Sequence, residues 1–166
     1  MKWHTMKAIN NRFFQPFSWI LFFVFSTNLV AQEDEACLPP DKKIVKLLEN
    51  ANKSQDARVA ATNFAKAIEA APDNAMVSYE YAMYVYFTGL DLYETQASIQ
   101  LGDRSFKKAE ELFEQTIQLC NDYHANCTYF LGVINYMQKD NEAALKWFKQ
   151  FIEFKDRKST RLNSSH

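Results

Sequence analysis

The chain has 166 residues, of which 48% are hydrophobic and 23% charged, and its formal net charge is −1. This length suits one domain, or one domain with a leader, and the near-neutral charge argues against a bulk electrostatic attraction to nucleic acid or anionic lipid. Only 3 glycines and 4 prolines are present, whereas strands joined by tight turns need more of both. The composition therefore favours an all-α fold.

Residues 1–31 have the pattern of a secretory signal peptide. Lys2, Lys7 and Arg12 make a positive segment, residues 17–25 are apolar, and the small Ala31 offers a cleavage point. The apolar stretch is short for a membrane span, which needs roughly 20 residues. We expect cleavage and export, with an uncleaved anchor helix as the alternative. Residues 32–40 then form a linker, in which acidic residues precede Cys37 and do not resemble a lipobox.

Residues 41–155 show internal self-similarity with a period of about 34 residues. Each repeat contains a small residue followed four positions later by an aromatic one. The three pairs are Ala60 with Phe64, Ala109 with Phe113, and Ala144 with Phe148. A small residue at a helix crossing lets two backbones approach closely, and the aromatic side chain lies on the same face and fills the adjoining space. The pattern predicts stacked helix pairs.

The repeat divides into units at 41–74, 75–124 and 125–155, the last one truncated. We expect helices at 41–51, 56–71, 75–88, 103–120, 125–138 and 141–154. Extra residues at 88–104 interrupt the second unit, where Thr88–Gly89 is predicted to end a helix and 91–97 to form a short one. Asp73 or Asn74 is expected to cap the third helix, and Asp140 or Asn141 the last.

These features resemble the tetratricopeptide repeat family, through the small–aromatic pairs, Pro72 and Leu131–Gly132. The resemblance implies a right-handed solenoid of helix pairs, with a concave groove that binds a protein or peptide partner. The groove residues that it implies are Met76, Tyr79, Met83, Tyr86, Phe87, Tyr129, Val133, Tyr136 and Met137. The alternative is that several of these side chains belong to the core, because an aromatic stripe at helical spacing is often buried. At place 4, where the family has a large aromatic residue, the chain has Ile44, Ser78 and Thr128, so the repeats are divergent.

The leader, the Cys37–Leu38–Pro39–Pro40 entry and the divergent repeats together resemble the N-terminal repeat region of Bacteroidota envelope proteins. Those proteins continue into a β-propeller and an OmpA-like domain, and some serve type IX secretion. The resemblance implies a periplasmic, outer-membrane-associated docking arm. Two alternatives remain open: a structural spacer that positions further domains, and the regulatory arm of an enzyme.

Three cysteines are present, Cys37, Cys120 and Cys127. Export implies an oxidising compartment in which disulfides persist. Cys120 and Cys127 flank one turn, and their spacing allows a disulfide across the unit boundary, which would leave Cys37 unpaired. The alternative is that Cys120 and Cys127 are two small buried side chains.

The sequence does not predict an enzyme, a metal site or a cofactor. Of the three histidines, only His124 lies between the leader and the tail, and one histidine without a placed partner makes a poor general base. We expect it in a solvated turn. Glu110, Glu111 and Glu114 alternate with lysines and indicate a solvated helix face. No phosphate-binding glycine loop or nucleophile elbow is present, so neither a small-molecule substrate nor a nucleic acid is expected.

Residues 156–166 have no apolar periodicity. Codon by codon, they match one reading frame of a widely used short-read sequencing adapter. We interpret them as a translated adapter without a structural role, with a polar tail as the alternative.

Overall fold

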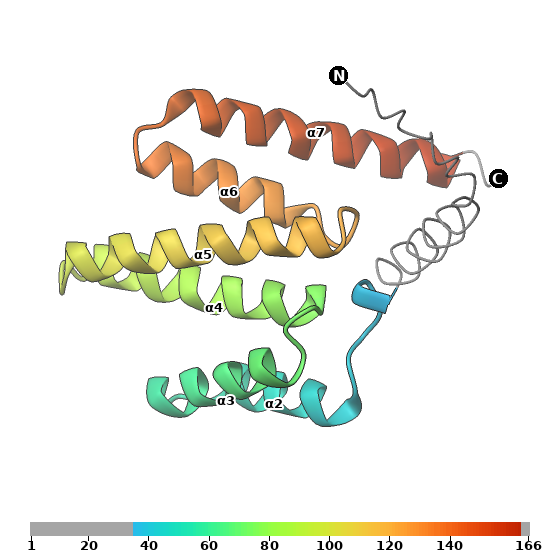
Figure 1. Cartoon of the computed structure of the whole chain (residues 1–166). Helices are drawn as coiled ribbons and strands as arrows, with labels where there is room; N and C mark the ends of the chain where they lie inside the picture. Colours follow the sequence, from blue (N-terminus) through green and yellow to red (C-terminus); the bar gives the residue numbers. More distant parts are fainter. Residues whose placement is uncertain (1–34, 164–166) are drawn as a thin grey trace, which may run out of the picture. The chain divides into compact units, whose positions relative to one another are not determined.

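The computed structural model of the chain describes residues 35–163, with side chains up to Arg157. The predicted signal peptide and the first part of the linker lie outside these residues. From Asp41 to Asn163 the chain forms six helices and no strand, so the all-α prediction is confirmed (Figure 1). The helices are α2 (Lys42–Lys53), α3 (Ala57–Ala70), α4 (Ala75–Glu94), α5 (Ile99–Leu119), α6 (Asn126–Met137) and α7 (Asn141–Asn163).

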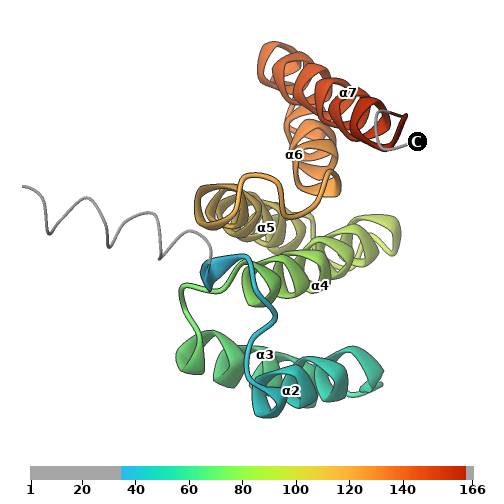
Figure 2. The ribbon, with the colours of Figure 1, turned by 90° about the vertical axis from the view of Figure 1, so that its right-hand side faces the viewer.

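Consecutive helices pack in pairs, α2 with α3, α4 with α5, and α6 with α7. The middle pair touches both of its neighbours, since α4 packs against α2 and α3 and α5 packs against α6. Figures 1 and 2 show the pairs side by side in chain order. Each pair can therefore bury its apolar face against the next one.

Side-chain oxygens cap most of these helices. Asp41 and Asp56 accept hydrogen bonds at the starts of α2 and α3, and Ser98 does so at the start of α5. Of the predicted alternatives, Asn74 caps α4 and Asp140 caps α7, where its Oδ1 accepts from the backbone nitrogen of Ala143 at 3.0 Å. Each cap satisfies backbone N–H groups that have no partner inside the helix.

The small–aromatic pairs lie in the core, as the repeat pattern predicts. Phe64 and Ala60 are buried in the first helix pair, and Phe113 and Ala109 in the second. In the third pair Ala144 is buried and Phe148 half-buried. Phe148 fills the space beside Gly132, because a Cβ atom on that glycine would come within 2.6 Å of its ring.

The extra residues of the second unit lengthen α4 and α5 instead of forming a separate insertion. The predicted end at Thr88–Gly89 is wrong, since α4 continues to Glu94 and turns at Gln96, whose φ is 52°. Gly89 is needed for close packing: a Cβ there would lie 3.0 Å from Cβ of Ser105 on α5 and 3.3 Å from O of Gly102. The resulting hairpin projects beyond the ends of α3 and α6 in Figure 1.

The last helix also runs further than expected. Residues 156–163 were predicted to lack structure, but α7 continues through them to Asn163. Arg157 reaches Asp122 in the α5–α6 turn at 3.7 Å, in an exposed ion pair. The interpretation of these residues as a translated adapter concerns their origin and stays a prediction.

Within residues 35–163, no helix combines the length and apolar character that crossing a bilayer requires.

Candidate functional site

The nine predicted groove residues divide into a buried, a half-buried and an exposed set. Tyr79 and Tyr86 are 9% and 6% exposed and belong to the main core cluster. The half-buried set packs against the core and comprises Met76, Met83, Val133 and Met137. Three aromatic side chains remain well exposed: Phe87 at 52%, Tyr129 at 41% and Tyr136 at 65%.

Tyr79 and Tyr86 are core residues, so their assignment to a partner groove is wrong. The ring of Tyr79 packs against Phe113 at 6.2 Å and Tyr123 at 5.6 Å, and Tyr86 packs against Phe130 at 4.7 Å. Burial raises the pKa of both phenols. These two tyrosines join α4 to α5, to the α5–α6 turn and to α6, and they stabilise the stack rather than bind a partner.

Four aromatic rings contact one another in series, Phe87, Phe130, Tyr129 and Phe151. Together with the exposed Tyr136 on α6, we call them the aromatic strip. Phe87 on α4 contacts Phe130 on α6 at 6.3 Å. Phe130 contacts Tyr129 at 5.4 Å, and Tyr129 contacts Phe151 on α7 at 5.4 Å. Tyr136 continues the same face of α6, since residues seven positions apart fall nearly above each other on a helix.

A groove of about 550 Å³ opens beside Phe87, where the α2–α3 turn faces α4. We call it the α4 groove. Its α4 wall comprises Glu80, Met83, Tyr84, Phe87, Thr88 and Asp91, and the other wall includes Asn52, Ser54 and Gln55. Thr88 and Asp91 come from the extra residues of the second unit. Met83 and Phe87 are predicted groove residues, but the predicted helix end at Thr88–Gly89 leaves Asp91 off this wall. The spacing from Glu80 to Asp91 nevertheless fits one helix face.

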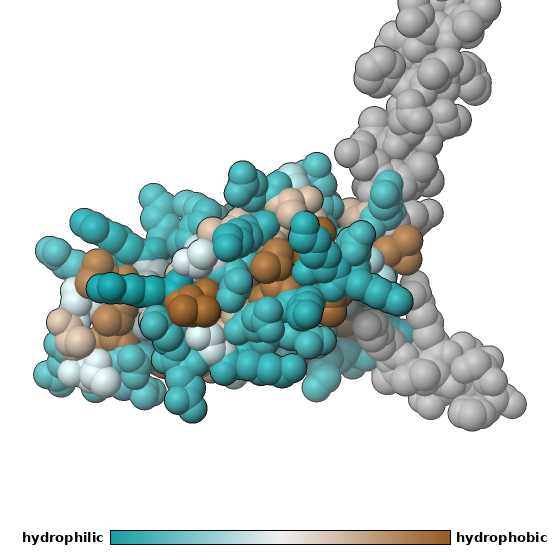
Figure 3. Space-filling view, turned by 90° about the horizontal axis from the view of Figure 1, so that it is seen from below, coloured by the Kyte–Doolittle hydropathy of each residue, from teal (hydrophilic) through white to brown (hydrophobic). Residues whose placement is uncertain are grey.

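Hydrogen bonds fix the two walls of the α4 groove. The hydroxyl of Tyr84 donates to the carbonyl oxygen of Ala57 at 3.1 Å. The side-chain amide of Asn52 donates to Oε2 of Glu80 at 2.9 Å. Both bonds cross from the first helix pair to α4, so they link the two walls of the groove. On the face drawn in Figure 3, hydrophobic patches are small and separated by hydrophilic side chains.

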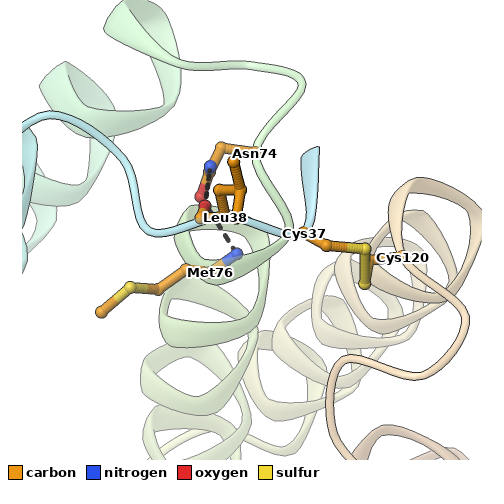
Figure 4. Close-up of a disulfide and its surroundings, with 5 residues drawn as sticks. All are labelled: Cys37, Leu38, Asn74, Met76 and Cys120. Carbon is orange, nitrogen blue, oxygen red and sulfur yellow. Dashed lines mark hydrogen bonds between the residues drawn. A yellow bond between two sulfur atoms is a disulfide. The ribbon is translucent and has the colours of Figure 1, made fainter. Parts of the chain in front are cut away.

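The disulfide joins Cys37 to Cys120, which lie 83 positions apart in the chain, with a Cα–Cα distance of 5.3 Å (Figure 4). The predicted Cys120–Cys127 pair is therefore wrong. Cys120 ends α5 facing the entry segment, whereas Cys127 lies in the first turn of α6 and points into the core. Burial raises the pKa of the Cys127 thiol to about 12, so this thiol stays protonated and unreactive at neutral pH.

Of the residues considered for catalysis, His124 makes a hydrogen bond and Glu111 an ion pair within the fold. His124 lies in the α5–α6 turn, where its Nδ1 accepts a hydrogen bond from the backbone nitrogen of Asn126 at 3.1 Å. Glu111 pairs with Lys108 at 3.2 Å on the exposed face of α5. Partial burial, with Glu110 and Glu111 nearby, raises the pKa of Glu114. Among the residues described by the structure, no group of His, Cys, Asp and Glu side chains is placed to hold a metal ion.

Comparison with known proteins found no matching family model, no matching curated protein and no matching solved structure.

Proposed function

We propose that the chain is a non-catalytic protein-interaction module of the cell envelope, built from tetratricopeptide-type repeats stacked as a right-handed solenoid. Three helix pairs in chain order and small–aromatic pairs buried inside them support the repeat assignment. Because Tyr79 and Tyr86 are buried, the side chains proposed to contact a partner are the exposed ones, Phe87, Tyr129 and Tyr136. The partner is a protein or a peptide.

The aromatic strip is the observation that carries this proposal. Phe87, Tyr129 and Tyr136 expose large aromatic surface on two helices of different pairs. Phe87 also lines the α4 groove. Aromatic side chains offer much contact area, and tyrosine adds a polar end, which makes them frequent anchors of protein interfaces. A fold that needed only its own stability would gain by burying these rings or replacing them with polar residues.

The disulfide supports a location outside the cytosol. Cys37 and Cys120 tie the entry segment to the end of α5, and such bonds persist in oxidising compartments and are rare in reducing ones. Together with the predicted leader, this favours a periplasmic docking arm of a larger protein associated with the outer membrane.

Site-specific photo-cross-linking in living cells tests the proposal. A photoreactive phenylalanine analogue at Phe87 or Tyr136 is expected to trap the same protein partner. The same analogue at Lys66, an exposed position on α3 outside the strip, serves as the control and should trap none.

Substitution then separates docking from mere spacing. The Phe87→Ser, Tyr136→Ser variant should keep its fold, because both side chains are largely exposed, and should lose partner affinity by at least about tenfold. Lys66→Ser is the matched control. If the double variant keeps its partners and its cellular role, the chain acts as a spacer that positions other domains.

A further inference from the structure

One face of α4 carries a carboxylate at each end of the α4 groove with apolar side chains between them. Glu80 and Asp91 are the two carboxylates, and Met83 and Phe87 lie between them. Positions 80, 83, 84, 87, 88 and 91 follow the three- and four-residue steps of a single helix face. The order along the groove is therefore acidic, apolar, acidic.

No positive charge balances these carboxylates inside the groove. None of the described residues that line it is a lysine or an arginine. Within residues 35–157, neither Glu80 nor Asp91 takes part in a salt bridge, and the nearby Lys53 pairs with Glu49 at 3.3 Å instead. Asn52 occupies Oε2 of Glu80, which leaves the other carboxylate oxygen for a ligand. The groove is thus complementary to positive charge.

The spacing of the carboxylates sets the spacing of the charges that would match them. Eleven residues of α-helix rise roughly 16 Å. An extended chain advances at most about 3.3–3.6 Å per residue, so roughly five residues of peptide cover the same distance. Lysine and arginine also lay their aliphatic stems along apolar and aromatic surface, and here that surface is provided by Met83 and Phe87.

We propose that the α4 groove binds an extended protein segment with two basic side chains about five residues apart and an apolar side chain between them. This inference rests on the proposed docking function and names the chemistry of its partner. Asp91 comes from the extra residues of the second unit, so the second carboxylate exists only because α4 is lengthened past Gly89.

Peptide binding to the full, oxidised chain tests the inference, with fluorescence anisotropy as the readout. The probe is a labelled peptide with two lysines about five positions apart and a leucine between them. One comparison peptide has glutamates in place of the lysines, and another has the same composition with adjacent lysines. The spaced-lysine peptide should bind most tightly, and its affinity should fall as salt is raised.

Charge-neutral variants locate the contact. Asp91→Asn and Glu80→Gln are each expected to weaken the spaced-lysine peptide by about two- to fivefold, as exposed ion pairs do. Glu80→Gln retains an acceptor for Asn52, so the groove wall is kept. Glu142→Gln on α7 removes the same charge outside the groove and should change nothing.

Three outcomes would overturn the inference. If the glutamate peptide binds as tightly as the spaced-lysine peptide, the charges of Glu80 and Asp91 do not select the partner, and equal binding of the adjacent-lysine peptide excludes their spacing in the same way. If Phe87→Ala weakens the binding of these peptides all the same, the groove is a docking site without charge selectivity. Unchanged affinity in Asp91→Asn means that the peptide binds elsewhere. If sedimentation shows a dimer that Phe87→Ala dissociates, a second copy of the chain occupies the groove. Failure of the docking function itself is read separately, from the absence of cross-linked partners at Phe87 and Tyr136.

Discussion

The side-chain amide of Asn74 donates a hydrogen bond to the carbonyl oxygen of Leu38, 36 positions earlier in the chain, over 2.9 Å. The oxygen of the same amide accepts from the backbone nitrogens of Met76 at 3.1 Å and Val77 at 3.3 Å. One side chain therefore starts α4 and also holds the entry segment beside it (Figure 4).

The two roles of Asn74 are separable by substitution. Asn74→Asp keeps the acceptor for the helix but loses the donor to Leu38, and it should cost about 1 kcal/mol of unfolding free energy. Asn74→Ala loses both and should cost about 1–3 kcal/mol. Urea denaturation of the oxidised chain measures both values. An aspartate variant as stable as the parent would show that the Leu38 bond contributes nothing.

The disulfide predicts a definite pattern of thiol chemistry. Digestion without reduction should yield a peptide pair linked through Cys37 and Cys120, with Cys127 alkylated only after unfolding. Because the bond closes a long loop, Cys37→Ser with Cys120→Ser should lower the unfolding free energy by about 2–5 kcal/mol. Cys127→Ala is the control that leaves the link intact. A peptide pair joining Cys120 to Cys127 would contradict the structure.

Gly132 should resist substitution because of Phe148. A Cβ at Gly132 would meet that ring within 2.6 Å, so Gly132→Ala is expected to cost about 1–2 kcal/mol, even though alanine favours the helix. In a Phe148→Leu background the same change should become neutral or stabilising. Thermal or chemical denaturation of the parent, the two single variants and the double variant completes this double-mutant cycle. An equal cost in both backgrounds would place the strain elsewhere.

Stability should fall in alkaline solution. Burial raises the pKa of Cys127 from 9.0 to about 12, and the pKa of Tyr123 from 10.0 to about 12. The folded state holds these protons more tightly, so its stability is complete below about pH 9 and decreases as the pH rises towards 12.

Each extra proton held by the folded state contributes up to about 1.4 kcal/mol per pH unit. Cys127→Ala, compared by brief denaturant titrations between these pH values, should flatten the decline. The same slope with and without Cys127 would mean that this thiol titrates normally in the fold.

Local sequence signals were sufficient for most helix starts and for the packing of each pair, although α5 begins at Ile99 and not at the predicted residue 103. Asn74 and Asp140 are short polar residues directly before apolar repeats, and both cap helices as their positions suggest. The small–aromatic spacing likewise predicted buried partners, because that spacing determines which side chains share a helix face.

Signals that depend on a distant partner were ambiguous. Gly89 follows Thr88 in a sequence typical of a helix end, but its contact is Gly102 on α5, and only the packed hairpin shows this. Tyr86 and Tyr136 have the same residue type and equivalent places in their units, but Tyr86 is covered by Phe106 and Phe130 while Tyr136 is exposed. The predicted Cys120–Cys127 pair is wrong for the same reason, because residues that are close in the chain need not be close in the fold.

The pairing of Cys37 with Cys120 has a consequence for how the chain matures. A polypeptide that meets an oxidant N-terminus first presents Cys37, then Cys120, then Cys127. The native bond joins the first and second thiols to emerge, so sequential oxidation makes it without reshuffling. Cys127 competes only until α6 folds and withdraws it from solvent. The yield of correctly linked protein then depends on whether Cys127 is buried before it is oxidised in place of Cys37 or Cys120. A disulfide isomerase is needed only when oxidation of Cys127 is faster than its burial.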